Sequence, residues 1–209
     1  MGPGDKPAGV ILAGGRSTRF GSDKASARLN GRPLLQWVAD ALSPVCAHIV
    51  VVRARGQVLP EVLSPVPLRL IDDVYDDLGP IAGLVAAFRA LEGGLAVAVS
   101  CDTPLLQPAL LRAMVEAAGD HDAVCGRAGS LQPLPGVFRV EACLPVFERR
   151  VADRRLALRG VFDDLRVRVL EEPDLRRRDP ALDSFRGANT PLELSAIEAT
   201  VRDPSRTAG

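Results

Sequence analysis

The sequence Ala-Gly-Val-Ile-Leu-Ala-Gly-Gly-Arg-Ser-Thr-Arg-Phe-Gly-Ser-Asp-Lys occupies residues 8–24 and decides the fold that we expect. Residues 8–13 form an apolar run, which is typical of a buried strand, and a Gly-rich, basic segment follows at its carboxyl end. Ligands of open α/β sheets bind at the carboxyl ends of the strands. The segment Leu12–Lys24 therefore predicts a ligand site beside the first strand.

The residue types in this segment suit a nucleotide. Gly14 and Gly15 carry no side chains, so backbone N–H groups can approach a phosphate or a base. Arg16, Arg19 and Lys24 offer cations for the phosphates. A simple Gly-rich turn between a strand and a helix would explain the two glycines, but it would not explain the three cations.

The spacing excludes the two commonest nucleotide motifs. The segment contains no GxGxxG, which argues against a dinucleotide fold, and no GxxxxGK[ST], which argues against a P-loop. A hydride-transfer enzyme and a P-loop NTPase are therefore disfavoured.

Short β-branched runs alternate with helical patterns along the rest of the chain, which predicts βαβ units around a mostly parallel sheet. We expect one domain over residues 1–202 and a flexible tail over 203–209. Expected strands cover residues 8–13, 48–52, 68–71, 95–100, 123–125 and 134–140, and expected helices cover 34–42, 81–91, 108–118, 142–151 and 192–200.

The last third of the chain is more polar. The stretches 149–159 and 174–179 are rich in charge and predict solvated surface, with a basic rim for an anionic substrate as the alternative. Thr190 followed by Pro191 is typical of a helix start, with Thr190 as the cap.

Two acidic residues follow predicted strands. Asp102 comes just after the strand 95–100, at the same predicted sheet edge as the Gly-rich segment, and a carboxylate there suits Mg²⁺ that carries nucleotide phosphates. The alternative for Asp102 is a turn that caps the next helix. Asp73 follows the strand 68–71, in a loop where acidic residues are ordinary.

Composition limits the partners and the compartment. Lys+Arg and Asp+Glu both number 26, so the charge balance favours neither nucleic acid nor a membrane surface as a partner. The 4 cysteines are too widely spaced for a CxxC pair and predict reduced thiols in a cytoplasmic core. No apolar stretch predicts a signal peptide or a membrane span, and the sequence does not indicate an oligomeric state.

Taken together, the motifs resemble the molybdenum cofactor guanylyltransferases, a nucleotidyltransferase family. The resemblance rests on the Gly-rich segment and on four further motifs in the same order, so it covers most of the chain. These motifs are Ile71-Asp-Asp73, Gly79-Pro-Ile-Ala-Gly83, Cys101-Asp-Thr-Pro104 and Asn189-Thr-Pro191.

The resemblance implies a Rossmann-like three-layer α/β/α sandwich that transfers GMP from GTP to the terminal phosphate of molybdopterin, or of its molybdenum-loaded form, with release of pyrophosphate. Magnesium is the implied cofactor, and Asp102 would bind both the metal and the nucleotide. The implied nucleotide contacts are Leu12, Ala13, Gly14, Gly15, Lys24, Asp73 and Gly79.

We expect catalysis to depend on charge neutralisation by Lys24, Arg19 and the metal at Asp102, because the acceptor phosphate is already largely ionised and needs no general base. The expected contacts on the pterin side are Asn189 and Gln132 with its segment Gln132-Pro133-Leu134, together with Arg154, Arg155 or Arg159. The turn Gly79-Pro80 is expected to shape the base pocket. The two histidines, His48 and His121, are expected to be structural or surface residues.

Two positions depart from the family pattern. Val52 stands where some members carry an Asn at the end of the second strand, and Gly187 stands where the family often has a further Asn. Two other functions stay open: transfer from CTP or to a sugar 1-phosphate, and a nucleotide-binding module without turnover.

Overall fold

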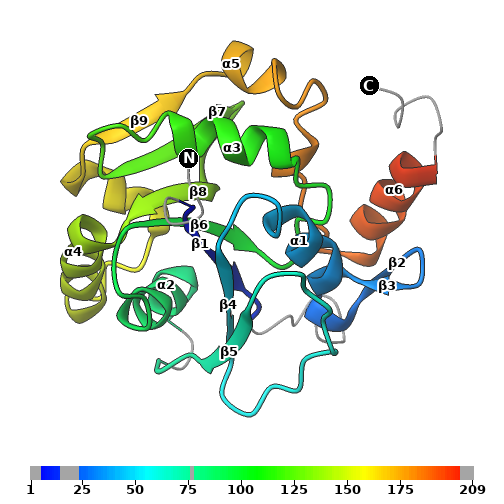
Figure 1. The fold of residues 1–209 in the computed structure, drawn as a ribbon, viewed down its shortest axis with the longest axis horizontal. Helices are drawn as coiled ribbons and strands as arrows, with labels where there is room; N and C mark the ends of the chain where they lie inside the picture. Colours follow the sequence, from blue (N-terminus) through cyan, green and yellow to red (C-terminus); the bar gives the residue numbers. More distant parts are fainter. Residues whose placement is uncertain (1–5, 15–23, 76–77, 203–209) are drawn as a thin grey trace.

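The computed structural model describes residues 6–14, 24–75 and 78–202, except for the side chain of Lys24. Its centre is a 7-stranded sheet in the order β5-β4-β1-β6-β8-β7-β9 (Figure 1). Within the described sheet, β8 alone runs antiparallel to its neighbours. The strands are β1 Ala8–Leu12, β4 His48–Arg53, β5 Leu68–Asp72, β6 Leu95–Ser100, β7 Ala123–Ala128, β8 Ser130–Arg139 and β9 Val167–Leu170.

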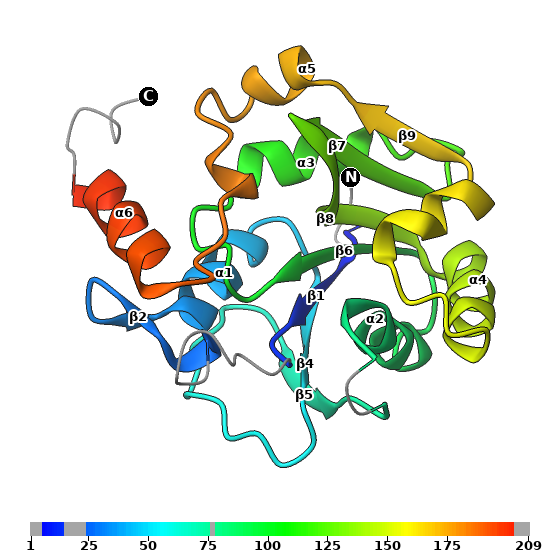
Figure 2. The same cartoon turned by 180° about the vertical axis from the view of Figure 1, so that it is seen from behind.

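Helices cover both faces of the sheet, which confirms the predicted three-layer sandwich (Figures 1 and 2). One face carries α1 Leu34–Leu42 and α3 Pro108–Glu116, and the other carries α2 Pro80–Arg89 and α4 Val140–Ala152. The smaller elements are η1 Lys24–Ser26, β2 Arg28–Leu29, β3 Arg32–Pro33, η2 Leu158–Asp164, α5 Glu172–Arg176, η3 Asp183–Phe185 and α6 Pro191–Arg202.

The first strand shows why this sequence builds a sheet with two covered faces. Successive side chains of a strand point to opposite faces, and here both sets are apolar. Val10 and Leu12 pack with α2 and α4, whereas Ile11 packs with α1 and α3. Because β1 is buried on both faces, it reads as a continuous apolar run instead of an alternating one.

The chain crosses from one half of the sheet to the other at β1. After β1 it forms β4 and β5 on one side, and it then returns to form β6 on the other side of β1. Such a switch point opens a crevice at the carboxyl ends of the strands, where α/β proteins bind their ligands.

Besides short segments such as β2, β3 and the 3-10 turns, sequence reasoning missed one strand and one helix, and it made two neighbouring strands too short. The strand β9 and the helix α5 lie in the polar last third, where charge had suggested irregular surface. β9 is an edge strand of 4 residues, Val-Arg-Val-Leu, and edge strands are often short and charged. The expected strands 123–125 and 134–140 are longer in the structure and form the β7–β8 hairpin.

The β7–β8 hairpin continues past two prolines, which had suggested a shorter strand in the sequence. Cys125 pairs with Gly136 and Gly126 pairs with Gln132, so Pro133, Leu134 and Pro135 form a bulge between these pairs. A proline in a bulge does not need to donate a ladder hydrogen bond. The bulge thus keeps the hairpin intact and places Leu134 opposite the end of β6.

The prediction of a solvated surface over 149–159 and 174–179 is wrong for two charged residues, Arg150 and Asp179, which are buried. Arg150 is 2% exposed and its Nε donates to Asp164 Oδ2 at 2.8 Å. Asp179 is 2% exposed and accepts hydrogen bonds from the backbone of Asp183 and Ser184. Arg150 thereby joins α4 to η2, and Asp179 closes the loop that leads into η3.

Asp122 joins β7 to β9 at the far edge of the sheet. Its Oδ2 accepts from the backbone N–H of Arg166 at 2.9 Å, and its Oδ1 accepts from Nη2 of the same arginine at 2.7 Å. These hydrogen bonds lower the pKa of Asp122 below its ordinary value.

The substitution Asp122→Asn should lower the free energy of unfolding at pH 7 by about 1 kcal/mol, because it removes a charge-assisted pair whose arginine is exposed. A carboxyl group with a lowered pKa stabilises the fold above its ordinary pKa, 3.8, and loses this effect as the pH falls through the lower folded value. The difference between parent and variant should therefore shrink below pH 3.8.

Urea unfolding at a series of pH values measures this difference. Asp153→Asn, at an exposed position just after α4, is the matched control and should unfold like the parent. A difference that stays constant down to the acid limit would contradict the assignment.

Candidate active site

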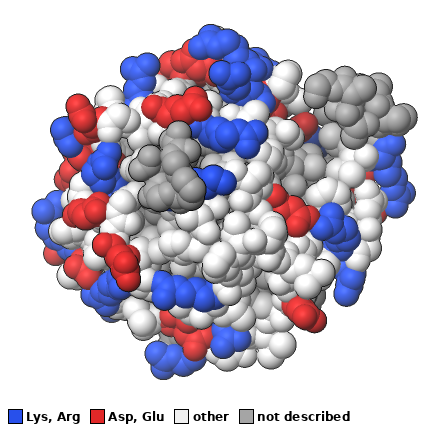
Figure 3. Space-filling view, in the orientation of Figure 1, with Lys and Arg blue, Asp and Glu red and all other residues white. Residues whose placement is uncertain are grey.

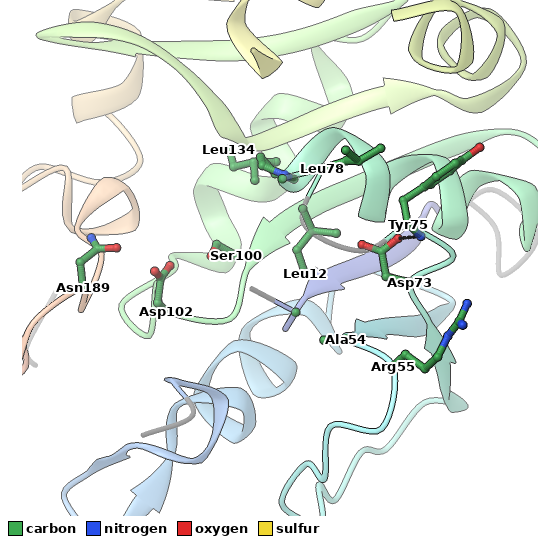
Figure 4. A pocket seen from close by; sticks show the side chains of 13 residues that line it. Leu12, Ala54, Arg55, Asp73, Tyr75, Leu78, Ser100, Asp102, Leu134 and Asn189 are labelled. Carbon is green, nitrogen blue, oxygen red and sulfur yellow. Dashed lines mark hydrogen bonds between the residues drawn. The ribbon is translucent and has the colours of Figure 1, made fainter. Parts of the chain in front are cut away.

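A cavity of about 810 Å³ opens at the carboxyl edge of the sheet, between the ends of β1, β4, β5 and β6 (Figure 4). It lies at the switch point described above. Its lining consists of Leu12, Gly14, Ala54, Arg55, Asp73, Tyr75, Leu78, Gly79, Pro80, Ser100, Asp102, Leu134 and Asn189.

Asp102 is held rigidly at one end of this cavity. The backbone of Cys101 donates to Leu12 O at 3.1 Å, and the hydroxyl of Thr103 donates to Ser100 O at 2.8 Å. The carbonyl oxygen of Asp102 accepts from the N–H of Ala188 at 2.7 Å, and the residue is 9% exposed. The helix after it, α3, begins at Pro108, so Asp102 does not cap that helix, and the alternative of a capping turn is wrong.

Asp73 lies at the other end, one residue after β5. Its N–H continues the ladder by donating to Arg53 O at 2.7 Å, and its Oδ1 accepts from the N–H of Tyr75 at 3.0 Å. The carboxylate faces the cavity together with Leu78 and Gly79 (Figure 4). Gly79 has φ +73°, a backbone conformation that favours glycine, and it immediately precedes α2.

The strand β1 ends against a tight turn after β4. Gly14 approaches this turn so closely that an added Cβ would lie 2.9 Å from the backbone nitrogen of Ala54. The N–H groups of Ala13 and Gly14 both donate to Val52 O, at 2.8 Å and 3.1 Å. The expectation that Gly14 frees its N–H for a nucleotide is therefore corrected: its missing side chain is what lets the two strand ends meet.

The structure brings together most of the predicted site residues that it describes. Leu12, Gly14, Asp73, Gly79, Asp102 and Asn189 all line the cavity. Ala13 is 4% exposed and belongs to the core beneath the cavity. Gly15, Arg19 and the side chain of Lys24 lie outside the described residues.

Gln132 does not line the cavity, although it lies two residues from Leu134. Its amide nitrogen donates to Ser130 Oγ at 3.1 Å, and Nη2 of Arg159 donates to the same oxygen at 3.2 Å. Arg154 and Arg155 do not line it either. The role of these residues in pterin binding stays a prediction.

The segment 187–189 packs on Asp102. A Cβ added to Gly187 would lie 2.9 Å from Asn189 Nδ2 and 3.7 Å from Asp102 Oδ1, so the small residue at 187 allows this close packing. Thr190 Oγ1 accepts from the N–H of Glu193 at 3.2 Å, which confirms Thr190 as the cap of α6. Asn189 lines the cavity at the end where Asp102 lies (Figure 4).

Pro80 and Leu134, which lie in segments that the sequence indicated, also line the cavity, whereas five lining residues were missed from the sequence: Ala54, Arg55, Tyr75, Leu78 and Ser100. The pair Arg55-Gly56 directly after the second strand was an available turn signal. Val52, the departure noted above, is 1% exposed and packs in the core, so Ala54 and Arg55 represent the end of β4 in the cavity.

Comparisons with known proteins agree with this geometry. The family model described as MobA-like NTP transferase domain matches residues 9–169. The molybdenum cofactor guanylyltransferase of Desulfosudis oleivorans is 33% identical over 208 residues, which cover 95% of this chain and 97% of that protein. The chain belongs to the molybdenum cofactor guanylyltransferase family.

Further relatives extend the comparison. A probable molybdenum cofactor guanylyltransferase of Chloroflexus aggregans is 32% identical, covering 92% of this chain and 93% of that one. The crystal structure of molybdopterin-guanine dinucleotide biosynthesis protein A from Archaeoglobus fulgidus superposes with a TM-score of 0.76 at 25% identity over 93% of this chain and 98% of that chain. The 2-C-methyl-D-erythritol 4-phosphate cytidylyltransferase of Thermus thermophilus shares the fold alone, with a TM-score of 0.70 at 16% identity over 95% of this chain and all of that one.

Membership of this family makes the chain a nucleotidyltransferase.

The cysteines and histidines of the chain do not line the cavity. Burial raises the pKa of Cys46 and Cys143 to about 12 and that of Cys125 to about 11, so these thiols stay protonated. His48 begins β4 at the opposite end of the strand, and His121 lies in a turn before β7. Neither histidine lines the cavity, as the sequence predicted.

No helix in the described part of the chain has both the length and the apolar character required to span a membrane.

Gly14→Ala should lower the free energy of unfolding by about 1 to 3 kcal/mol, since its Cβ meets backbone and not a flexible side chain. It should also weaken nucleotide binding at least about tenfold, because the strand end must move within the cavity wall. Calorimetric titration and urea unfolding of the purified variant measure the two effects.

Gly9→Ala is the matched control in the same strand. Its Cβ would meet the side chains of Cys46 and Ile49, both at 3.2 Å, in the core and away from the cavity. It should lower stability but leave nucleotide affinity unchanged. Equal nucleotide affinity for both variants would show that the contact at Gly14 does not shape the site.

Proposed function

We propose that the protein transfers GMP from GTP to the terminal phosphate of molybdopterin in a Mg²⁺-dependent reaction that releases pyrophosphate. The observation that carries this proposal is the placement of Asp73 and Asp102 at opposite ends of one cavity, each fixed by backbone hydrogen bonds. Membership of the guanylyltransferase family and the names of the near full-length relatives support the choice of substrates.

Asp73 suits the guanine base. An ionised carboxylate accepts hydrogen bonds, and guanine presents two adjacent donors, N1–H and the exocyclic amine, which cytosine lacks. The Asp73 carboxylate is oriented by the N–H of Tyr75, so it is held in place before the base arrives. Pro80 and Leu78 supply apolar contact area beside it.

Asp102 suits a magnesium ion. Mg²⁺ is commonly held by one or two carboxylates together with substrate phosphates and water. The carboxylate of Asp102 belongs to a residue that is only 9% exposed, and Asn189 and Ser100 add further oxygen atoms to the same end of the cavity. This donor set fits Mg²⁺, which supplies positive charge to the phosphates when it is bound.

The reaction requires in-line approach and charge neutralisation. An oxygen of the terminal phosphate of molybdopterin forms a new bond to the α-phosphorus of GTP, while the bond from that phosphorus to the bridging oxygen of the β-phosphate breaks. The acceptor is largely ionised at neutral pH, so no proton has to be removed from it. We assign Lys24 and Arg19 to the triphosphate on the basis of the family motif.

The residues of the chain have separate roles in positioning the substrates. Asp73 would hold the base, and Asp102 would hold the metal that neutralises the phosphates. The sheet sets the distance between the two carboxylates. Positioning of this kind accounts for a large share of the barrier reduction in phosphoryl transfer. Asn189, which faces Asp102 across the segment 187–189, is placed to contact the acceptor.

The second candidate is a cytidylyltransferase, because such an enzyme shares the fold. Incubation of the purified protein with Mg²⁺, molybdopterin and one radiolabelled NTP at a time decides between the two. We expect a dinucleotide product and pyrophosphate with GTP alone. Equal product from CTP would overturn the guanine assignment, and no product from any NTP would indicate a binding module without turnover.

Asp102→Asn should keep the fold and reduce Mg²⁺-dependent transfer at least about 100-fold, since the amide preserves the shape but removes the charge that holds the metal. Steady-state kinetics over a series of Mg²⁺ concentrations, with the melting temperature as a check on folding, measure this loss. Asp120→Asn, at an exposed position outside the cavity, should behave like the parent. If Asp102→Asn turned over substrate at the parental rate, the assignment of the metal to Asp102 would be wrong.

A further inference from the structure

Arg55 follows β4 in an exposed turn and is one of the residues that line the cavity. Among the residues that the structure describes, it is the only cation in the cavity lining. It lies at the end where Asp73 and Tyr75 lie, across the cavity from Asp102 and Asn189 (Figure 4). This placement puts its guanidinium at the nucleoside end of the site.

The turn that carries Arg55 is closed by hydrogen bonds of Gln57. Gln57 N–H donates to Ala54 O at 3.0 Å, and Gln57 Oε1 accepts from the N–H of Ala54 at 2.9 Å, so the turn is closed twice. Gln57 Nε2 also donates to Ala13 O at 3.1 Å, which ties the turn to the end of β1. Gly56, with φ +75°, supplies the left-handed conformation that the turn requires.

The side chain of Arg55, in contrast, makes no hydrogen bond or ion pair within the described part of the chain. The side chain of the nearby Arg53 is paired: Nε donates to Asp72 Oδ1 at 2.8 Å and Nη1 donates to Gln57 O at 3.1 Å. Many other arginines of this protein also pair with carboxylates, and both signs of charge alternate around the face shown in Figure 3. Arg55 therefore lies on a turn held by hydrogen bonds, and its guanidinium is available to a ligand in the cavity.

We propose that Arg55 reads the guanine base by donating to its O6 and N7 atoms. A guanidinium presents parallel N–H donors in a planar fork, and O6 and N7 of guanine are the matching pair of acceptors. Asp73 offers the opposite chemistry, because it accepts from N1–H and the exocyclic amine on the adjacent edge of the same base. This inference rests on the proposed function and names a second specificity-determining residue for it.

The two residues together explain selection against adenine as well as cytosine. Adenine carries an amine donor where guanine has O6, so it would face the donors of Arg55, and it lacks the N1–H that Asp73 accepts. A site that is built to hydrogen-bond particular groups rejects an analogue without them more strongly than an apolar pocket does.

The test uses 7-deaza-GTP, which lacks the N7 acceptor and keeps the edge that Asp73 contacts. The parent should bind GTP about tenfold more tightly than 7-deaza-GTP, the change expected for one charge-assisted hydrogen bond. Arg55→Met, which keeps the apolar stem of the side chain and removes the donors to both O6 and N7, should bind GTP about 100-fold more weakly and bind both nucleotides equally. Calorimetric titration gives the four dissociation constants.

Arg112→Met is the matched control. Arg112 is exposed on α3 and does not line the cavity, so this variant should keep the parental affinities and the parental ratio. Arg55→Lys keeps the charge without the fork, and it should retain little of the discrimination against 7-deaza-GTP.

Two results would overturn the inference while leaving the proposed function intact. If Arg55→Met transferred GMP and kept the parental ratio of GTP to 7-deaza-GTP affinity, Arg55 would not contact N7. If Arg55→Met lowered the affinity for GTP and for 7-deaza-GTP by the same factor, and Arg55→Lys restored both affinities, Arg55 would act on the phosphates through its charge. If the parent itself bound no GTP, the proposed function would fall, and this inference with it.

Discussion

Parallel pairing of β1 with β4 on one side and with β6 on the other is the constraint on which the rest of the structure depends. Leu12 pairs with Val52 and with Ser100, so three strands end at the same level. Their next residues must leave the sheet at one edge, and each departure is fixed by hydrogen bonds to a neighbouring strand. Chain segments that are far apart in sequence thereby contribute to one cavity.

The cavity is built from backbone groups that are already hydrogen-bonded. Val52 O accepts from both Ala13 and Gly14, and Leu12 O accepts from Cys101, so the strand ends have no unpaired N–H at these places. The polar side chains of Asp73, Asp102, Asn189 and Arg55 line the cavity together with apolar residues such as Leu12 and Leu78. A rigid frame with a few polar groups favours positioning, which is what transfer between two phosphates requires.

Local patterns were sufficient wherever a residue's role follows from its neighbours in sequence. The apolar run of β1, the helix start at Thr190-Pro191 and the acidic residues after β5 and β6 were all predicted because each has a short-range signal. The charge-rich last third was harder to predict, because β9 pairs with a distant strand and Arg150 is buried by a partner that lies 14 residues away. No local pattern carries such long-range pairing.

The sequence by itself determined the fold class, the family and the two carboxylates of the candidate site, since motifs in a fixed order encode these. Only the tertiary structure decided which residues share the cavity. It placed Leu134 there through a bulge of prolines and Arg55 through a turn that is tied to β1, and it left Gln132 outside. The physical reason is that strand register and turn geometry set the direction of a side chain, and both depend on pairing partners that are distant in sequence.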